Sequence, residues 1–422
     1  MSIADVSRNP FAAFASLTAV QRRTFTAAYL GWTLDAFDFF LVVFVVSRVA
    51  TEFNMSIPTV AFAITVTLML RPLGALIFGR LADRFGRRTP YMINIFIYSV
   101  VELLTAFSPN FTTFLILRAL YGVAMGGVWG VGAALALEAL PTKTRGLFSG
   151  ILQQGYAAGY LLAAVAYFFV FPHFGWRGMF FIGVLPALLV IYVWKAVPES
   201  QVWLENKQQK LAEVSIWASF AKQPGLYIYA IVLMAAFNFM SHGSQDLYPT
   251  FLQKQREFGV GTVTLLAIIA NIGAIVGGIF FGALSQHFGR RRSIALAACV
   301  GILMIPLWVF APNVALLAVG AFLLQVFVQG AWGVVPVHLN ELSPAEARGT
   351  FPGFTYQLGN LISAGAAQME AAFATHFTTP SGGANYAVAL SIIMLIVFLA
   401  VAVLAWFGYE RHSVEFAPGT AA

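Results

Sequence analysis

Apolar stretches of about 20 residues recur along the whole chain, and each is long enough to cross roughly 30 Å of hydrocarbon as an α-helix. Of the 422 residues, 59% are hydrophobic and only 10% are charged. An ordinary soluble domain has about a quarter of its residues charged. The sequence therefore predicts an all-α membrane protein.

Twelve transmembrane helices are predicted. They cover residues 24–48, 58–80, 89–108, 111–138, 149–171, 178–196, 226–250, 262–284, 293–311, 314–340, 351–374 and 385–408. The first is too long for the core of a signal peptide, so we expect it to stay in the membrane as an anchor. The single cysteine, Cys299, excludes an internal disulfide and a multi-cysteine metal site.

The formal net charge of +7 follows a pattern along the chain. Basic residues cluster in every second connection, near positions 22, 80–88, 143–145, 195–222, 290–292, 348 and 411. Lys254 and Arg256, in a predicted outer loop, are an exception. The alternation follows the positive-inside rule. We therefore expect a multi-pass protein of the plasma or bacterial inner membrane, with both termini cytoplasmic and with lipid rather than nucleic acid as its partner.

An internal repeat divides the chain into two halves. "GRLADRFGRR" begins at Gly79 and "GALSQHFGRR" at Gly282, while "EALPTKTRG" begins at Glu138 and "ELSPAEARG" at Glu341. Both pairs are 203 residues apart (282 − 79 and 341 − 138). Because this offset holds an even number of spans, the two halves are predicted to insert with the same orientation.

The longest hydrophilic segment, "PESQVWLENKQQKLAEV", lies close to the middle of the chain and separates the halves. We predict a cytoplasmic amphipathic segment at 1–21, an N-terminal six-helix bundle at 22–197, a cytoplasmic linker at 198–224, a C-terminal six-helix bundle at 225–410 and a cytoplasmic tail at 411–422.

Over nearly its full length the chain resembles the major facilitator superfamily. "GRLADRFGRR" is similar to that family's loop between helices 2 and 3, and "RALYGVAMGG" to its helix 4 proton-relay motif. The resemblance implies two pseudo-symmetric six-helix bundles that rock about a central site. In the loop, Asp83 should lie near a helix N-terminus or an arginine and form a conformational latch. Gln286 replaces this acid in the second copy, where we expect a weaker latch. The predicted latch residues are Gly79, Asp83, Arg87, Arg88, Glu138, Arg145, Glu341 and Arg348.

Charged residues inside predicted spans are costly and are functional by default. They are Asp35, Asp38, Arg71, Glu102, Arg118 and Asp246. Asp35 and Asp38 are three residues apart, so both should face inward, toward an arginine. The alternative is a static ion pair that holds helices together. Glu102 could instead lie at the membrane interface.

The stretch "NFMSHGSQDLYPT" places polar groups on one helix face. Asn238 and His242 are followed at the same face by Gln245 or Asp246. The repeat offset aligns Asp35 with Asn238 (35 + 203), so both halves present polar groups at one depth. We expect that depth to be a central cavity with a binding or proton-handling role. A lone helical histidine is more often structural, but here an aspartate lies one turn away.

The same stretch resembles the helix 7 signature of Jen-type lactate and pyruvate proton symporters at eight positions. That family also has an arginine in helix 2 and a Gln and Asn three apart in helix 11. Sialic acid symporters, wider relatives, tend to have an acid where this chain has Val128. The expected substrate-binding residues are Arg71, Asn238, His242, Gln245, Gln357 and Asn360, and the expected proton-coupling residues are Asp35, Asp38, Arg118 and Asp246.

Charge balance predicts that anion and proton move together. An inside-negative potential opposes entry of an anion by about 2.3 kcal/mol per 100 mV. Arg71 could grip a carboxylate with its planar fork, while in the empty carrier it or Arg118 is balanced by Asp35 or Asp38. Arrival of the anion would leave one carboxylate without its partner, and that group would take up a proton.

We therefore expect a monomeric proton-coupled symporter of small monocarboxylates that works by alternating access. Another organic acid, such as sialic acid, shikimate or an aromatic acid, and uniport stay open as alternatives. A membrane enzyme would use His242 and Asp246 as a general base, and a receptor would bind without translocation. The sequence contains no nucleotide-binding loop, so we expect no cofactor and no ATP-driven step.

Overall fold

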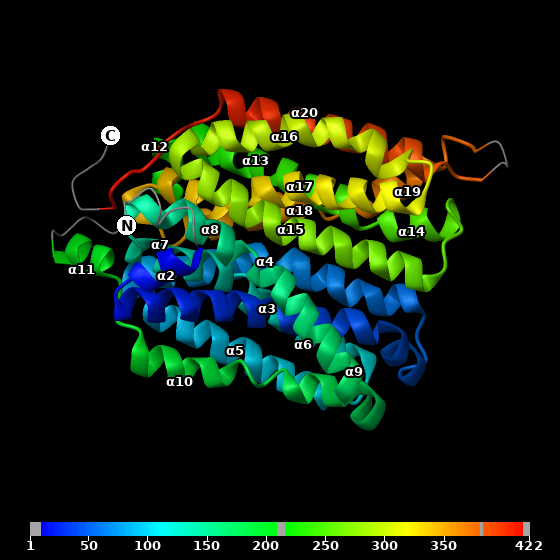
Figure 1. The fold of residues 1–422 in the computed structure, drawn as a ribbon. Coiled ribbons are helices and arrows are strands. Elements are labelled where there is room, and N and C mark those ends of the chain that lie inside the picture. The colour runs from blue at the N-terminus through cyan, green and yellow to red at the C-terminus, as the bar shows by residue number, and fades with distance from the viewer. Residues whose placement is uncertain (1–9, 209–215, 380–382, 417–422) are drawn as a thin grey trace.

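The computed structural model describes residues 10–208, 216–379 and 383–416, so the first nine residues of the predicted amphipathic segment lie outside it. Two helical bundles lie side by side with their helix axes roughly parallel (Figure 1). Both described chain ends lie at the end of the molecule that carries α2 (Pro10–Ser16), which we call the terminal end. The opposite end, which carries α14 (Tyr248–Lys254), is called the loop end.

The first bundle begins with a long helix whose start is set by Thr18. The Thr18 hydroxyl accepts from the Gln21 amide and the Gln21 side chain accepts from the Thr18 amide, a capping box. The helices of this bundle are α3 (Ala19–Glu52), α4 (Ile57–Phe85), α5 (Arg88–Ala106), α6 (Phe111–Met125), α7 (Val128–Ala139), α8 (Arg145–Gln153), α9 (Gly155–Ile182) and α10 (Ala187–Ala196).

Two short helices, α11 (Gln201–Gln208) and α12 (Ile216–Lys222), lead to the second bundle at the terminal end. The second bundle contains α13 (Pro224–Gln245), α14, α15 (Val260–Phe288), α16 (Arg290–Val309), α17 (Val314–Leu342), α18 (Phe351–Ser363), α19 (Ala366–Ala374) and α20 (Tyr386–Phe407).

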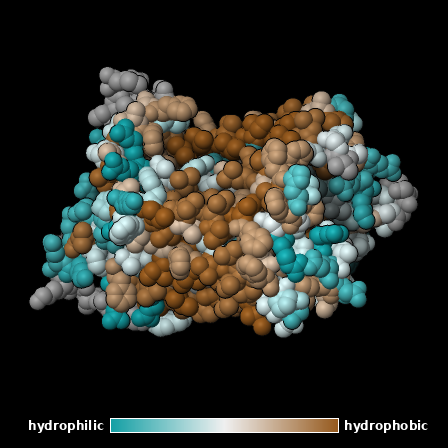
Figure 2. Space-filling model, turned by 90° about the horizontal axis from the view of Figure 1, so that it is seen from below, coloured by the Kyte–Doolittle hydropathy of each residue, from teal (hydrophilic) through white to brown (hydrophobic). Residues whose placement is uncertain are grey.

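Within the described residues, ten helical segments are long and apolar enough to cross a membrane. One of them, Thr142–Ala196, reverses direction near Gly175, where φ is 63°, so that α10 returns toward the terminal end. It therefore supplies two crossings, and α18 with α19 supplies the twelfth. Figure 2 shows a brown hydrophobic belt between two teal ends, as a bilayer requires.

Five of the predicted helices are interrupted, and two of these breaks lie at Gln154 and at residues 183–186, within the predicted spans 149–171 and 178–196. The predicted span 226–250 breaks after Gln245, because Pro249 has no amide hydrogen to donate and its ring crowds the preceding turn. The predicted span 111–138 breaks at Gly126 and Gly127, between α6 and α7. The predicted span 351–374 breaks between Ser363 and Ala366.

Small residues bring the two bundles together at the terminal end. A Cβ on Gly150 would lie 2.3 Å from the Gly278 carbonyl oxygen, and one on Gly146 would lie 2.5 Å from that of Gly282. Helices α8 and α15 are thus in backbone contact, the usual role of glycine between membrane helices. The Ser149 hydroxyl adds a hydrogen bond of 2.8 Å to the Gly333 carbonyl of α17.

The chain after α20 also joins the bundles. The Glu410 carboxylate accepts from the amides of Arg290 and Arg291, at 3.0 Å each, and so caps the first turn of α16. The ring of Phe416 then contacts two guanidinium groups, with Arg145 3.8 Å and Arg348 4.4 Å from its centroid. These arginines come from different halves, so the tail contacts both.

Candidate functional site

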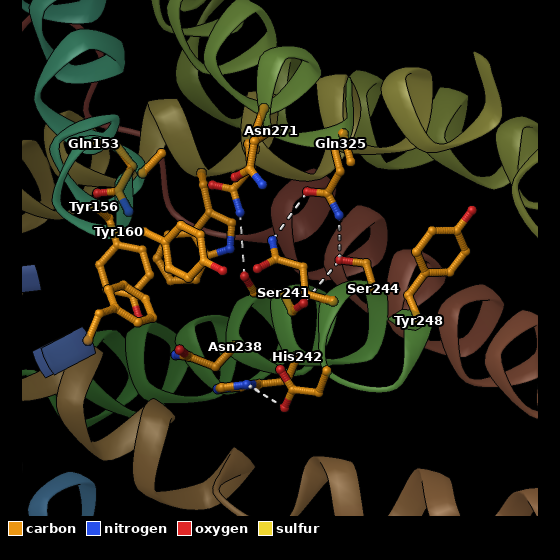
Figure 3. Close-up of a pocket in the computed structure, with 18 of the residues that line it drawn as sticks. Gln153, Tyr156, Tyr160, Asn238, Ser241, His242, Ser244, Tyr248, Asn271 and Gln325 are labelled. Carbon is orange, nitrogen blue, oxygen red and sulfur yellow. Dashed lines mark hydrogen bonds and ion pairs between the residues drawn. The ribbon is translucent and has the colours of Figure 1, made fainter. Parts of the chain in front are cut away.

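A cavity of about 500 Å³ lies between the bundles, and α3, α4, α9, α13, α15, α17 and α18 all contribute to its walls (Figure 3). Six of the predicted site residues line it: Arg71, Asn238, His242, Gln245, Asp246 and Asn360. The prediction that the polar positions of these helices meet at a central chamber is therefore consistent with their placement.

One side of α13 presents an acid–base pair. His242 Nδ1 lies 3.0 Å from Asp246 Oδ2, one turn along the helix. Asn360, from α18, interacts with the same imidazole ring. Asn238 donates from Nδ2 to the Met234 carbonyl at 2.8 Å, which leaves its side-chain oxygen free to accept a bond from a ligand. The pair can therefore exchange a proton with a molecule in the cavity.

Another side of α13 is bonded to α17. Gln325 accepts from the Gln245 amide and donates to the Ser244 hydroxyl, both at 3.2 Å, and Gln329 donates to Ser241 at 3.4 Å. Figure 3 shows Ser244 directed toward Gln325 of α17, whereas Asn238 and His242 lie on the other side of α13. The two glutamines both line the cavity and bridge the helices.

Arg71 is the positive charge of the cavity. It is 2% exposed, and among the described residues its Nε and Nη2 atoms have no hydrogen-bond partner. The side chains of Tyr156 and Tyr356 interact electrostatically with its guanidinium group. Because an unpaired buried guanidinium is unfavourable, the arrangement is suited to an anionic ligand.

The two aspartates of α3 lie outside the cavity lining. Asp35 and Asp38 are fully buried, and within the described part of the chain their carboxylate oxygens accept no hydrogen bond. Asp35 lies within electrostatic reach of Arg71, and Asp38 within reach of Arg118.

Arg118 has a different partner from the one expected. Its guanidinium forms an ion pair with Glu102 and lies 4.3 Å from the centroid of the Tyr121 ring, and both charged side chains are 0% exposed. The expectation that Asp35 or Asp38 balances Arg118 directly is thus corrected. Glu102 lies four residues before the end of α5 and is buried against Arg118 rather than exposed at the protein surface.

Gln357 does not reach the cavity in this conformation. It is fully buried in α18, with no hydrogen-bond partner for its amide among the residues described. Its repeat counterpart, Gln154 (357 − 203), does line the cavity. Of the predicted pair, Asn360 lines the cavity and Gln357 does not. Side chains three residues apart on a helix point in directions that differ by about 60°.

Sequence reasoning missed several polar and aromatic lining residues. They are Gln153, Gln154, Tyr156, Tyr160, Tyr248 and Asn271. The repeat offset would have found Gln154 from Gln357. It would also have paired Trp129 with Trp332 (129 + 203), whose rings lie 4.8 Å and 5.7 Å from that of Tyr356.

The latch residues of the first half lie at the terminal end. Asp83 accepts from the Gly349 amide and from the Thr350 hydroxyl of the other half, both at 2.6 Å. Arg87 bridges Asp83 at 3.0 Å and Glu138 at 2.9 Å. Gly79 lies against the Thr350 backbone, where a Cβ would approach Cα to 2.6 Å.

The second half repeats this geometry. Gln286 accepts from the Gly146 amide at 3.0 Å, and Arg290 contacts Glu341 at 2.8 Å. The equivalences 83 to 286, 87 to 290, 138 to 341 and 146 to 349 all have the offset of 203. Toward the opposite half, Gln286 therefore accepts one hydrogen bond as a neutral amide, whereas the Asp83 carboxylate accepts two.

The remaining predicted latch residues support these contacts. Arg88 donates to the Trp194 carbonyl, and its amide bonds Glu199. Arg145 donates to the Leu137 carbonyl at 3.0 Å. Burial lowers the pKa of Arg348, while the nearby Glu138 carboxylate acts in the opposite direction.

Comparison with known proteins gives consistent results. Residues 28–367 match the family described as Major Facilitator Superfamily. A carboxylic acid transporter protein homolog of Saccharomyces cerevisiae is 31% identical over 437 residues, 96% of this chain and 70% of the relative. The sialic acid transporter NanX of Escherichia coli is 31% identical over 352 residues, 80% of this chain and 84% of NanX.

The fold is also similar to a solved structure. The proton:xylose symporter XylE, with a bound bromodeoxyglucose, superimposes with a TM-score of 0.72, covering 93% of this chain and 97% of XylE. The sequences are 18% identical, so this likeness concerns the fold.

Proposed function

Because the chain belongs to the major facilitator superfamily and is a secondary transporter of organic acids, we propose that it carries small monocarboxylates, such as lactate and pyruvate, together with protons. It works by alternating access and as a monomer, with the terminal end and both termini on the cytoplasmic side.

The unpaired guanidinium of Arg71 is the observation that carries this proposal. It lies in a wall of the cavity, nearly removed from solvent, with two nitrogens that lack partners among the described residues. A carboxylate can accept two parallel hydrogen bonds from such a group. His242 and Asn360 supply polar contacts for the rest of a small acid.

Proton coupling follows from the charges around this guanidinium. The first half buries the acids Asp35, Asp38 and Glu102 and the bases Arg71 and Arg118. A bound anion adds one negative charge to this set, and a proton restores the total of the empty carrier. Since unpaired charges in a membrane interior are costly, the empty and the fully loaded carriers are the two states that interconvert.

A larger polar acid is the second candidate. The cavity of about 500 Å³ exceeds what lactate fills, and Gln153, Gln154 and Asn271 line it with amides suited to hydroxyl groups. The similarity to NanX favours a sugar acid among such substrates.

Uptake into proteoliposomes tests both readings. We expect labelled lactate to accumulate when the outside is more acidic than the inside, and unlabelled pyruvate to compete. Acetate, shikimate and sialic acid serve as further competitors, and empty liposomes give the passive rate. Competition by sialic acid but not by pyruvate would replace the first candidate with the second. Uptake that ignores the pH gradient would contradict proton coupling.

A further inference from the structure

Glu370, in the second half, is a buried ionisable residue near His242 and Asp246 that the proposed mechanism does not use. Glu370 lies in α19 and is 2% exposed. Neither of its carboxylate oxygens has a hydrogen-bond partner among the residues that the structure describes. It is not among the residues that line the cavity. A buried carboxylate in this situation requires a proton or a cation.

The carboxyl group of Glu370 lies against α13 at Gly243, next to the residue His242 of the acid–base pair. A Cβ on Gly243 would lie 3.0 Å from Glu370 Oε1, so the absence of a side chain there lets the carboxyl reach the helix. The flanking residue His242 and the nearby Asp246 are the charged groups that interact with it. The opposite neighbour, α20, has no charged residue between Tyr386 and Phe407 and presents Met394.

The break between α18 and α19 separates two environments. Asn360 lies before the break and lines the cavity, while Glu370 lies after it and is enclosed. His242 of α13 interacts with both residues, through a side-chain hydrogen bond with Asn360 and electrostatically with Glu370. Its imidazole therefore lines the cavity and is also within electrostatic reach of an enclosed carboxyl.

We propose that Glu370 is a second proton-binding site of the carrier, which exchanges its proton with the His242–Asp246 pair. In this step the proton leaves a carboxyl oxygen of Glu370 and binds an imidazole nitrogen of His242, so the charge of the three groups together is unchanged. A substrate anion beside His242 then meets a positive ring. The inference rests on the proposed symport.

The matched substitutions are Glu370→Gln, which fixes the site neutral, and Glu370→Asp, which keeps the acid. We expect E370Q to keep substrate exchange but to lose at least about tenfold in accumulation driven by a pH gradient. We expect the aspartate variant to restore part of this accumulation. Gly243→Ala keeps the acid but crowds it, and we expect it to shift the pH profile of uptake.

A spectroscopic measurement separates failure of this inference from failure of the proposed function. Infrared difference spectra of the substrate-free protein between acidic and alkaline pH should contain a carboxyl band that E370Q lacks, whether or not lactate is transported. Loss of this band with an unchanged pH profile of uptake would overturn the exchange with His242. Retention of the band, or uptake driven by sodium instead of protons, would overturn Glu370 as a proton site.

Discussion

Asp83 and Gln286 occupy equivalent positions in the two halves and accept hydrogen bonds from equivalent amides of the opposite half, those of Gly349 and Gly146. The exchange is reciprocal: each half supplies an acceptor and a donor. It joins the halves at the terminal end, where the glycine contacts also lie. The two contacts differ in charge, so the predicted latch has a charged acceptor in one half and a neutral acceptor in the other.

Substitution of Asp83 should weaken the contact between the two halves at the terminal end. Asp83→Asn keeps one acceptor and loses the charge, and we expect the closed terminal end to be weakened by about 1–2 kcal/mol. Gln286→Glu should have the opposite effect. The measurement is alkylation of a cysteine placed at the buried position Ala347 in a Cys299→Ser background. Equal labelling of the three proteins would contradict a latch role.

Replacement of the Arg71 guanidinium by a lysine ammonium should weaken anion binding. We expect Arg71→Lys to raise the lactate concentration for half-maximal uptake by about 10- to 100-fold, because ammonium cannot make two parallel bonds to one carboxylate. Arg177→Lys, a change in an exposed ion pair with Glu52, is the matched control. Wild-type affinity in Arg71→Lys would exclude the fork as the anion site.

The α3 aspartates should separate coupling from exchange. We expect Asp35→Asn and Asp38→Asn to abolish accumulation driven by a pH gradient while lactate–lactate exchange continues, since exchange needs no net proton movement. Glu52→Gln removes an acid at the exposed end of the same helix and should leave accumulation unchanged. Full accumulation by both asparagine variants would remove α3 from the coupling mechanism.

The ion pair between Glu102 and Arg118 should matter for stability. Glu102→Gln leaves a fully buried guanidinium without its carboxylate, and we expect a loss of about 3–5 kcal/mol. Glu52→Gln disrupts the exposed pair with Arg177 and should cost less than about 1 kcal/mol. Thermal unfolding of the two variants in detergent compares them, and similar midpoints would show that the buried pair does not stabilise the fold.

Much of this architecture could be predicted from local patterns. Hydrophobic length gave the spans, and the constant offset of 203 residues gave the parallel halves and the pairing of Asp83 with Gln286. Helical spacing was enough to bring Asn238, His242 and Asp246 together on one side of α13.

Contacts between side chains of different helices could not be predicted from such patterns. Arg118 could have met Asp35, Asp38 or Glu102, and only the packing of α5 against α6 selects Glu102. The direction of Gln357 depends on how α18 is rotated in its bundle. Glu370 lies after the break between α18 and α19, in a segment whose composition alone does not distinguish a buried carboxyl from a surface one.

The position of Phe416 has a practical consequence for handling the protein. Its ring contacts the guanidinium groups of Arg145 and Arg348, one from each bundle. A substitution or covalent label that displaces the Phe416 ring would therefore disturb a contact shared by both bundles. A reporter group for this end of the molecule is better placed on a surface residue away from Phe416.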